Sequence, residues 1–189
     1  SAKKADEVAF IYDRRPENSG WSYSHELGRS HVEEVFGGKV KTMKYVLEDS
    51  GKDIYELIEQ AVQDGNEIIF TTHQKFLSAS LKKALEHPQV KILNCSLNEP
   101  SKHIRTYYAR MYEAKFISGM VAGAMAENDK IAYVADYPIY GMIANINAFA
   151  LGAQMTNPRA KVYLDWICLE DSNIGAHIEE VQPSIVSAR

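Results

Sequence analysis

Short apolar runs alternate with one-sided helical patterns through the first half of the chain, and this rhythm constrains the fold more than any other feature. The order is strand, helix, strand, helix, strand, helix, strand, with strands expected at residues 8–12, 39–47, 68–72 and 90–95. Such alternation is typical of a parallel sheet that is covered by helices on both faces. We therefore predict an α/β fold with a doubly wound parallel sheet.

The rhythm breaks at residues 102–127, which carry one long helical pattern. One face of this helix becomes small at Gly119 and Gly123, which favours a close approach of another backbone. The rhythm then resumes with a strand at 130–135, a helix at 141–155 and a strand at 161–168, whereas residues 174–189 show no convincing period.

Only two clear strands follow the long helix, and so small a sheet shields its own core poorly. We expect an N-terminal α/β lobe at 1–100. Residues 101–189 are expected to form a hinge and a second α/β lobe that is incomplete, so that the chain is a fragment of a longer two-lobed protein or is completed by a partner.

The composition is that of an ordinary globular domain, with 46% hydrophobic and 24% charged residues and a net charge of −4. No block of lysine or arginine indicates a nucleic-acid partner, and no apolar run is long enough to cross a bilayer. No signal peptide is recognisable, and a removed signal or lipid anchor stays open. Cys95 and Cys168 lie in apolar runs, compatible with buried thiols or with a disulfide.

Motifs of catalysis and cofactor binding are absent from the sequence. There is no dinucleotide-binding or P-loop glycine pattern after a strand and no Gly-x-Ser-x-Gly elbow. His25 and His31 are six residues apart and fall on different helix faces, which makes them a poor metal pair. We therefore predict no cofactor, no metal and no enzymatic activity.

Polar and aromatic residues cluster instead where three expected strands end, at 13–21, 71–73 and 136–140. The carboxyl ends of parallel strands point the same way, so all three groups are expected to face one crevice. A structural interpretation stays open beside this one: Tyr137 and Tyr140 cap the sheet, and Asp136 caps the following helix.

Several stretches, taken in order, resemble the basic membrane protein family, which are substrate-binding lipoproteins of ABC transporters. The first stretch is residues 8–13 with 21–28, which resembles the opening strand, aspartate, aromatic and helix of that family. The small-residue helix at 112–123 follows, and then the strand and helix at 130–136 and 147–153 with Asn157-Pro158. The resemblance covers most of residues 8–170.

The resemblance implies a type I periplasmic-binding-protein fold, in which two lobes close on a ligand, often a purine nucleoside. It places Asp13 where the family has a ligand-binding acid, and Trp21 where the family has a stacking phenylalanine. Two departures stand out: the segment 17–20 is one residue shorter than in the family, and Ser78 lies where the family often has a second aspartate. We expect recognition of the ribose or the base to differ accordingly.

The expected function is capture of a small ring-containing, nucleoside-like ligand for an ABC transporter permease, at the extracellular face of the membrane or in the periplasm. The protein is expected to be attached to the membrane only through a lipid anchor. The alternative is a ligand-sensing regulatory module on the same fold. The expected ligand-binding residues are Asp13, Asn18, Trp21, Thr72, His73, Asp136, Tyr137 and Tyr140.

Overall fold

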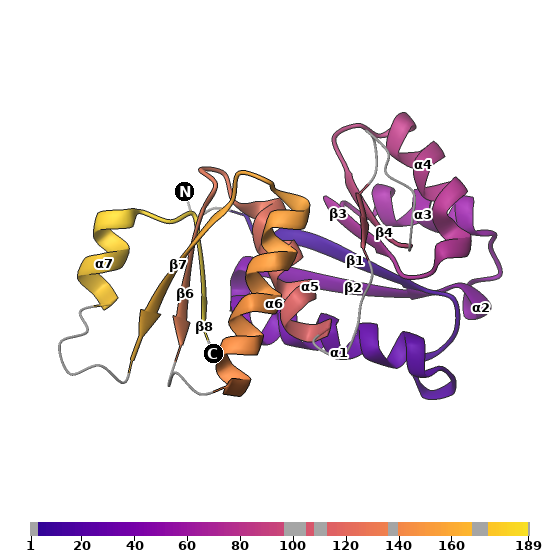
Figure 1. Ribbon diagram of the computed structural model, residues 1–189. Helices are drawn as coiled ribbons and strands as arrows, with labels where there is room; N and C mark the ends of the chain where they lie inside the picture. The colour runs from indigo at the N-terminus through magenta and orange to yellow at the C-terminus, as the bar shows by residue number, and fades with distance from the viewer. Residues whose placement is uncertain (1–3, 97–104, 108–112, 136–139, 168–173, 189) are drawn as a thin grey trace. The chain divides into compact units, whose positions relative to one another are not determined.

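Figure 1 shows the computed structural model, which describes residues 4–96, 105–107, 113–135, 140–167 and 174–188. The chain separates into two compact units, Ser1–Ala114 and Lys115–Arg189, and each is described by itself. The first unit extends past residue 100, where the sequence suggested a boundary between lobes, because a short strand at 105–107 pairs with the first sheet.

The first unit is a five-stranded sheet in which every pairing is parallel, with the strand order β2-β1-β3-β4-β5. Its strands are β1 (Asp6–Tyr12), β2 (Val40–Val46), β3 (Ile68–Thr71), β4 (Lys91–Cys95) and β5 (Arg105–Tyr107). Its helices are α1 (Gly20–Phe36), α2 (Leu47–Ser50), α3 (Ile54–Gln63) and α4 (Leu77–Glu86). The predicted α/β class with parallel sheets is confirmed.

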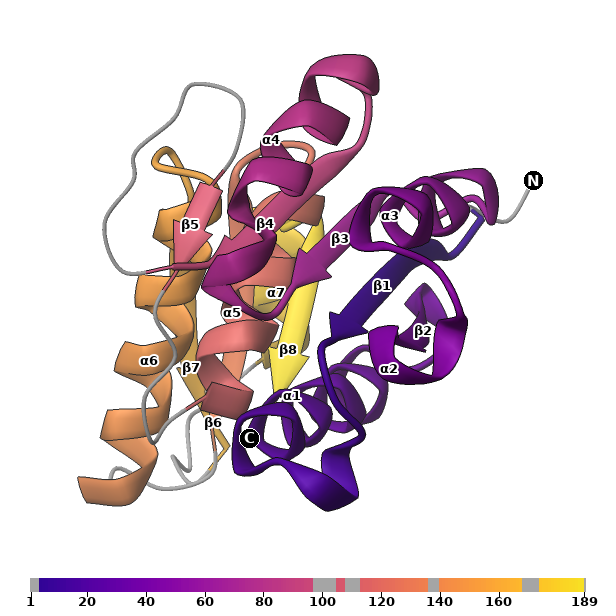
Figure 2. The ribbon, with the colours of Figure 1, turned by 90° about the vertical axis from the view of Figure 1, so that its right-hand side faces the viewer.

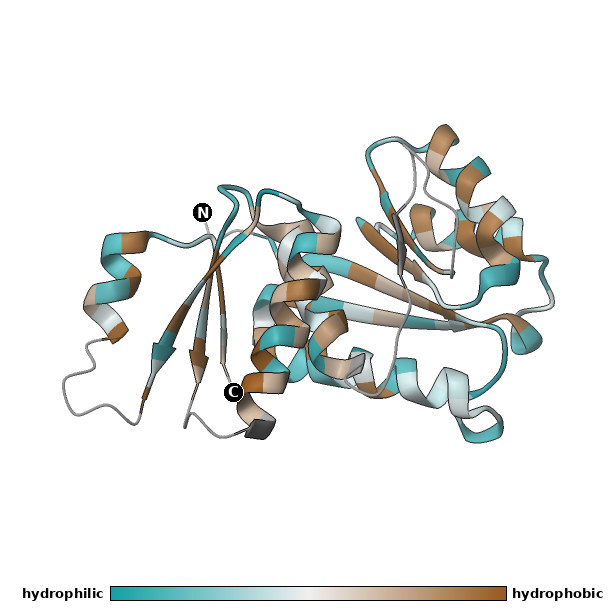
Figure 3. Cartoon of the chain, in the orientation of Figure 1, coloured by the Kyte–Doolittle hydropathy of each residue, from teal (hydrophilic) through white to brown (hydrophobic). Residues whose placement is uncertain are grey.

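Helices cover both faces of this sheet. Figure 2 shows α1 on one side of β1 and β2 and α3 on the other. The apolar faces of α3 and α4 pack against alternate residues of the strands, among them Ala9, Ile11 and Ile69, in one buried cluster. The hydropathy colours of Figure 3 follow this arrangement, because β3 is hydrophobic throughout most of its length whereas α1 carries much hydrophilic colour.

The helix ends follow signals that the sequence carries. The Asp53 carboxylate caps α3 by accepting a hydrogen bond from the Glu56 amide at 2.8 Å. Helix α1 ends at Phe36, and Gly37 follows it with a positive φ of 54° that a glycine adopts without strain.

The second unit is a three-stranded parallel sheet in the order β7-β6-β8. Its strands are β6 (Lys130–Ala135), β7 (Lys161–Trp166) and β8 (Ile185–Ala188), and its helices are α5 (Glu113–Met125), α6 (Tyr140–Thr156) and α7 (Ile174–Val181). Tyr133 of β6 and Phe149 of α6 are fully buried and meet edge to face, with ring centroids 4.9 Å apart.

Two sequence predictions were wrong in this region. Residues 102–127 do not form one helix, because β5 and α5 both lie within them. Residues 174–189, where the sequence shows no convincing period, contain α7 and β8. The second sheet therefore has three strands where two were expected. A strand as short as β8 carries too few residues to show a period, and its pairing with β6 comes from contacts more than fifty residues away in the chain.

Helices α5 and α6 approach each other so closely that glycines are required at their contact. A Cβ atom on Gly119 would lie 2.0 Å from the carbonyl oxygen of Phe149, and one on Gly123 would lie 2.2 Å from that of Ala153. A Cβ on Gly152 of α6 would lie 2.1 Å from the Phe116 carbonyl oxygen. These obstacles are backbone atoms, so a side chain at any of the three positions pushes the helices apart.

We expect Gly123→Ala to lower the free energy of unfolding by about 1–3 kcal/mol, because the added methyl group overpacks the contact between α5 and α6. Gly38→Ala is the matched control, since a Cβ there meets no atom within 4 Å. Thermal or urea unfolding of both variants measures the difference, and equal stabilities would contradict the close approach of the two backbones.

Candidate functional site

An open pocket of about 340 Å³ lies in the first unit where β1 and β3 end. It is lined by Asp13, Arg14, Asn18, Ser19, Trp21, Ser22 and His73. Strands β1 and β3 are neighbours, but the chain runs from β1 to β2 through α1 and from β3 to β4 through α4, in opposite directions along the sheet. This is a topological switch point, where open α/β sheets bind ligands.

Trp21 is the aromatic wall of the pocket. It lies in the first turn of α1 rather than in the preceding loop, and 41% of its surface is exposed. Its indole N–H donates a hydrogen bond to the backbone carbonyl of Thr72, beyond the end of β3. The ring also contacts His25 and His73, with centroids 5.6 and 6.5 Å away. The indole is therefore held in one orientation while part of it stays available to a ligand.

Thr72 supports the site in a different way from the one predicted. Its side chain is fully buried, and its hydroxyl donates to the Ile11 carbonyl of β1 at 2.8 Å. Its backbone carbonyl is the group that holds Trp21. Thr72 thus positions the aromatic wall, and its side-chain hydroxyl is occupied within the sheet.

Asp13 follows β1 directly and supplies the carboxylate of the pocket. One of its oxygens lies 2.5 Å from the ammonium of Lys75, and the other lies 3.9 Å from the guanidinium of Arg14. The side chain of Asp13 is 22% exposed. A ligand that donates a hydrogen bond to this carboxylate must share it with Lys75.

His73 contributes a neutral ring. Its Nδ1 accepts a hydrogen bond from the backbone N–H of Lys75 at 3.1 Å, and an amide N–H can only donate, so Nδ1 carries no proton. Desolvation, with the nearby charge of Lys75, lowers the pKa of His73 below its ordinary value, against a smaller opposing effect of Asp13. The proton of the neutral ring is therefore on Nε2, which offers a donor.

Asn94, near the end of β4, holds the segment that carries Thr72 and His73. Its side-chain amide is fully buried and donates to the Thr71 hydroxyl at 2.9 Å and to the His73 carbonyl at 3.0 Å. The Thr71 hydroxyl is in turn 2.8 Å from that of Ser80 on α4. Nothing in the sequence singled out Asn94, because its role depends on the adjacency of β3 and β4.

Four of the predicted ligand-binding residues line the pocket together: Asp13, Asn18, Trp21 and His73. Asp136 and Tyr137 lie outside the described residues, and so does the side chain of Tyr140, the first residue of α6. Their part in the site stays a prediction. Arg14, Ser19 and Ser22 also line the pocket but were not predicted, although the polar stretch 13–21 contains two of them.

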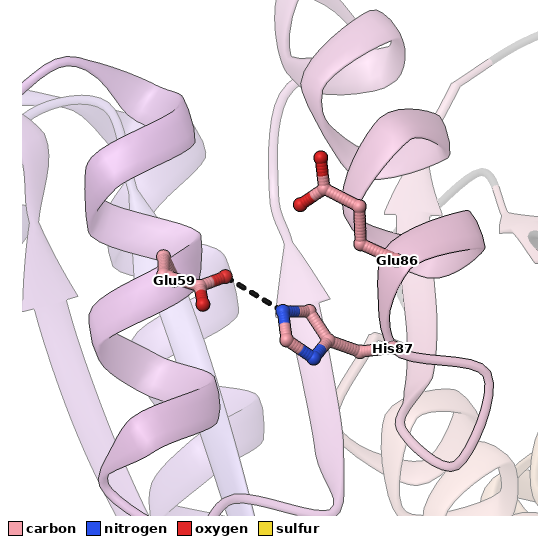
Figure 4. A group of neighbouring side chains, drawn as sticks. All are labelled: Glu59, Glu86 and His87. Carbon is pink, nitrogen blue, oxygen red and sulfur yellow. Dashed lines mark hydrogen bonds and ion pairs between the residues drawn. The ribbon is translucent and has the colours of Figure 1, made fainter.

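A second group of polar side chains, Glu59, Glu86 and His87, joins α3 to the end of α4, and its arrangement resembles a set of metal ligands. Figure 4 shows the ring of His87 directed at Glu59, with Nε2 and the carboxylate oxygen 2.7 Å apart. The Lys83 ammonium lies 3.1 Å from the Glu59 carboxylate and 2.8 Å from that of Glu86. Since this lysine already neutralises both acids, the group is an ion-pair network rather than a prepared cation site.

The chain also matches a known protein family. Residues 5–179 match the model of a family described as ABC transporter substrate-binding protein PnrA-like, which is the basic membrane protein family. The chain belongs to this family of substrate-binding proteins. The resemblance that the sequence suggested is therefore confirmed.

Two curated relatives give the degree of similarity. A purine-binding protein of Brucella abortus is 31% identical over 166 residues, which are 88% of this chain and 47% of the relative. A protein of Haloferax volcanii, named provisionally as an ABC transporter glucose-binding protein, is 28% identical over 160 residues, 85% of this chain and 40% of that relative. The chain thus spans less than half the length of these two relatives.

Solved structures with a similar fold include an ABC transporter solute-binding protein of Conexibacter woesei, with a TM-score of 0.47 and 15% identity over 86% of this chain and 54% of the other. A transcriptional activator of the comK gene from Bacillus halodurans has a TM-score of 0.45 and 17% identity, over 94% and 60% of the two chains. Among the described residues, no helix combines the length and the apolar character that crossing a bilayer requires.

The buried side chain of His25, next to Trp21, makes the stability of the fold depend on pH. It is 1% exposed, and its Nδ1 is 2.9 Å from the Trp21 carbonyl, which can only accept a hydrogen bond. Burial lowers the pKa of His25 to about 4 in the folded protein, against about 6.5 in the unfolded chain. The unfolded chain therefore binds the additional proton first. The stability that neutral His25 contributes is complete above about pH 6.5 and is lost as the pH falls towards about 4.

We expect the unfolding free energy of the wild type to fall more steeply between about pH 6.5 and about pH 4.5 than that of His25→Gln. The difference in slope should be at most about 1.4 kcal/mol per pH unit, the value for one proton. Urea denaturation at several pH values measures both slopes. Parallel slopes would show that His25 takes up its proton equally easily in the folded and unfolded states.

Proposed function

We propose that this chain is the ligand-capturing part of an extracytoplasmic substrate-binding protein of an ABC transporter, and that its ligand is a small flat ring such as a purine base or nucleoside. The observation that carries the proposal is Trp21, whose partly exposed indole is fixed beside a polar pocket at the β1–β3 switch point. Family membership and the purine-binding relative from Brucella abortus support it.

The chemistry of the pocket suits a ring with polar edges. An indole face stacks on an aromatic ring, and ordering of the indole by the Thr72 carbonyl before binding reduces the entropic cost of that contact. The Asp13 carboxylate accepts hydrogen bonds from ring or ribose groups, whereas Asn18 both donates and accepts. His73 adds a donor without adding a charge, because its ring is neutral.

The remaining parts of the proposal concern the whole protein. Asp136 and Tyr137, which follow β6 in the sequence, and Tyr140, which begins α6, would contribute further contacts to a ligand held between two lobes. Closure of the lobes would then present the loaded protein to the transporter permease. The protein would reach the membrane through a lipid anchor.

We expect Trp21→Ala to abolish ligand binding and to leave the fold largely intact, because this side chain is 41% exposed and contributes its ring mainly to the pocket. The matched control is Tyr23→Ala, which removes another aromatic residue of α1 that is 53% exposed and does not line the pocket. A thermal-shift screen of nucleosides, nucleobases and riboflavin on the full-length protein measures binding by the rise in melting temperature.

Binding of one of these compounds by the wild type and by Tyr23→Ala, but not by Trp21→Ala, would support the proposal. If none of the compounds stabilises the wild type, capture of a flat ring is wrong. If Trp21→Ala unfolds and Tyr23→Ala does not, Trp21 mainly stabilises the fold.

A further inference from the structure

Ser22 is buried in an unusual way. It lies in the first turn of α1, lines the pocket, and is 1% exposed. Its backbone N–H donates a hydrogen bond to the Ser19 hydroxyl oxygen at 3.3 Å, but within the part of the chain that the structure describes its own hydroxyl makes no hydrogen bond. Serines within helices often bond back to a carbonyl of the preceding turn. The Ser22 hydroxyl does not, and it is not one of the completely buried unpaired atoms of the described residues, so it borders the pocket. The hydroxyl of Ser22 is thus left for something in the pocket.

The pocket around Ser22 contains several groups that can only donate a hydrogen bond, beside Asn18 and Ser19, which can donate and accept. The first intrahelical bond of α1 runs from the Tyr23 N–H to the Ser19 carbonyl, so the N–H groups of Gly20 and Trp21 have no acceptor among the described residues. Arg14 contributes an exposed guanidinium. The main acceptor, the Asp13 carboxylate, is already shared with Lys75. These donor-only groups match a ligand edge that offers acceptors.

We propose that Ser22 is a direct ligand contact, whose hydroxyl donates to an acceptor on the edge of the ring that stacks on Trp21. This inference rests on the proposed function and deepens it. It identifies the ligand class as heterocycles with a carbonyl oxygen at that edge, in preference to heterocycles with an amino group there. An amino group would place its own donors against the N–H groups of Gly20 and Trp21, which cannot accept, although the Ser22 hydroxyl itself could turn to accept.

Two matched pairs of compounds test the assignment: inosine with adenosine, and hypoxanthine with adenine. The two members of each pair differ at one edge of the purine. The six-position carries an oxygen in one and an amino group in the other, and N1 carries a hydrogen only in the oxo compound. Isothermal titration of the full-length wild type should give tighter binding of the oxo compound. Ser22→Ala should lower the affinity for the oxo compound about three- to tenfold, the usual range for one hydrogen bond. The affinity for the amino compound should fall much less.

Ser30→Ala is the control, because Ser30 is an exposed serine of the same helix. Its affinities should equal those of the wild type. Ser22→Cys, which keeps the side chain nearly the same size with a much weaker donor, should reproduce the loss seen for Ser22→Ala. It also provides the measurement if the alanine variant does not fold.

The possible outcomes distinguish a failure of the Ser22 contact from a failure of the proposed function. Wild-type binding of the purines with unchanged affinities in the Ser22 variants would overturn the contact and leave the proposed function standing. An equal loss for oxo and amino compounds would overturn the assigned edge. Failure of the wild type to bind any of the four compounds would overturn the choice of a purine-like ligand and, with it, the role given to Ser22.

Discussion

The burial of β1 between two layers of helices is the constraint on which the pocket depends. The side chains from Val8 to Tyr12 are all fully buried, and Phe10 stacks on Phe70 of β3 with ring centroids 4.6 Å apart. A strand with no exposed residue has one register that keeps its apolar groups from water, so its end is fixed relative to its neighbours. That end places Asp13 beside the segment that carries Thr72 and His73.

The site is built from backbone contacts as much as from side chains. The Thr72 carbonyl holds Trp21, and the amide of Asn94 holds the chain on either side of Thr72. Each of these partners is buried or partly buried, so exchange with water is restricted and the geometry persists without a ligand. A preorganised wall of this kind lowers the cost of ordering the site when a ring binds.

Electrostatics in the pocket is arranged around a single carboxylate. Lys75 forms an ion pair with Asp13, and burial together with the charge of Lys75 lowers the pKa of His73 and disfavours its charged form.

Helices α5 and α6 of the second unit follow a different principle, because three glycines allow their backbones to meet where no side chain fits.

The sequence by itself determined the α/β class, the buried strands, the caps at Asp53 and Gly37, and the polar strand ends, because each follows from local periodicity or from the chemistry of single residues. Asp13, Trp21 and His73 could be predicted as neighbours for that reason. Tertiary structure alone decided that the hydroxyl of Thr72 turns into the sheet, that Ser22 lines the pocket, and that β5 and β8 are strands. These features depend on which distant segments lie side by side, and a local pattern carries no record of that.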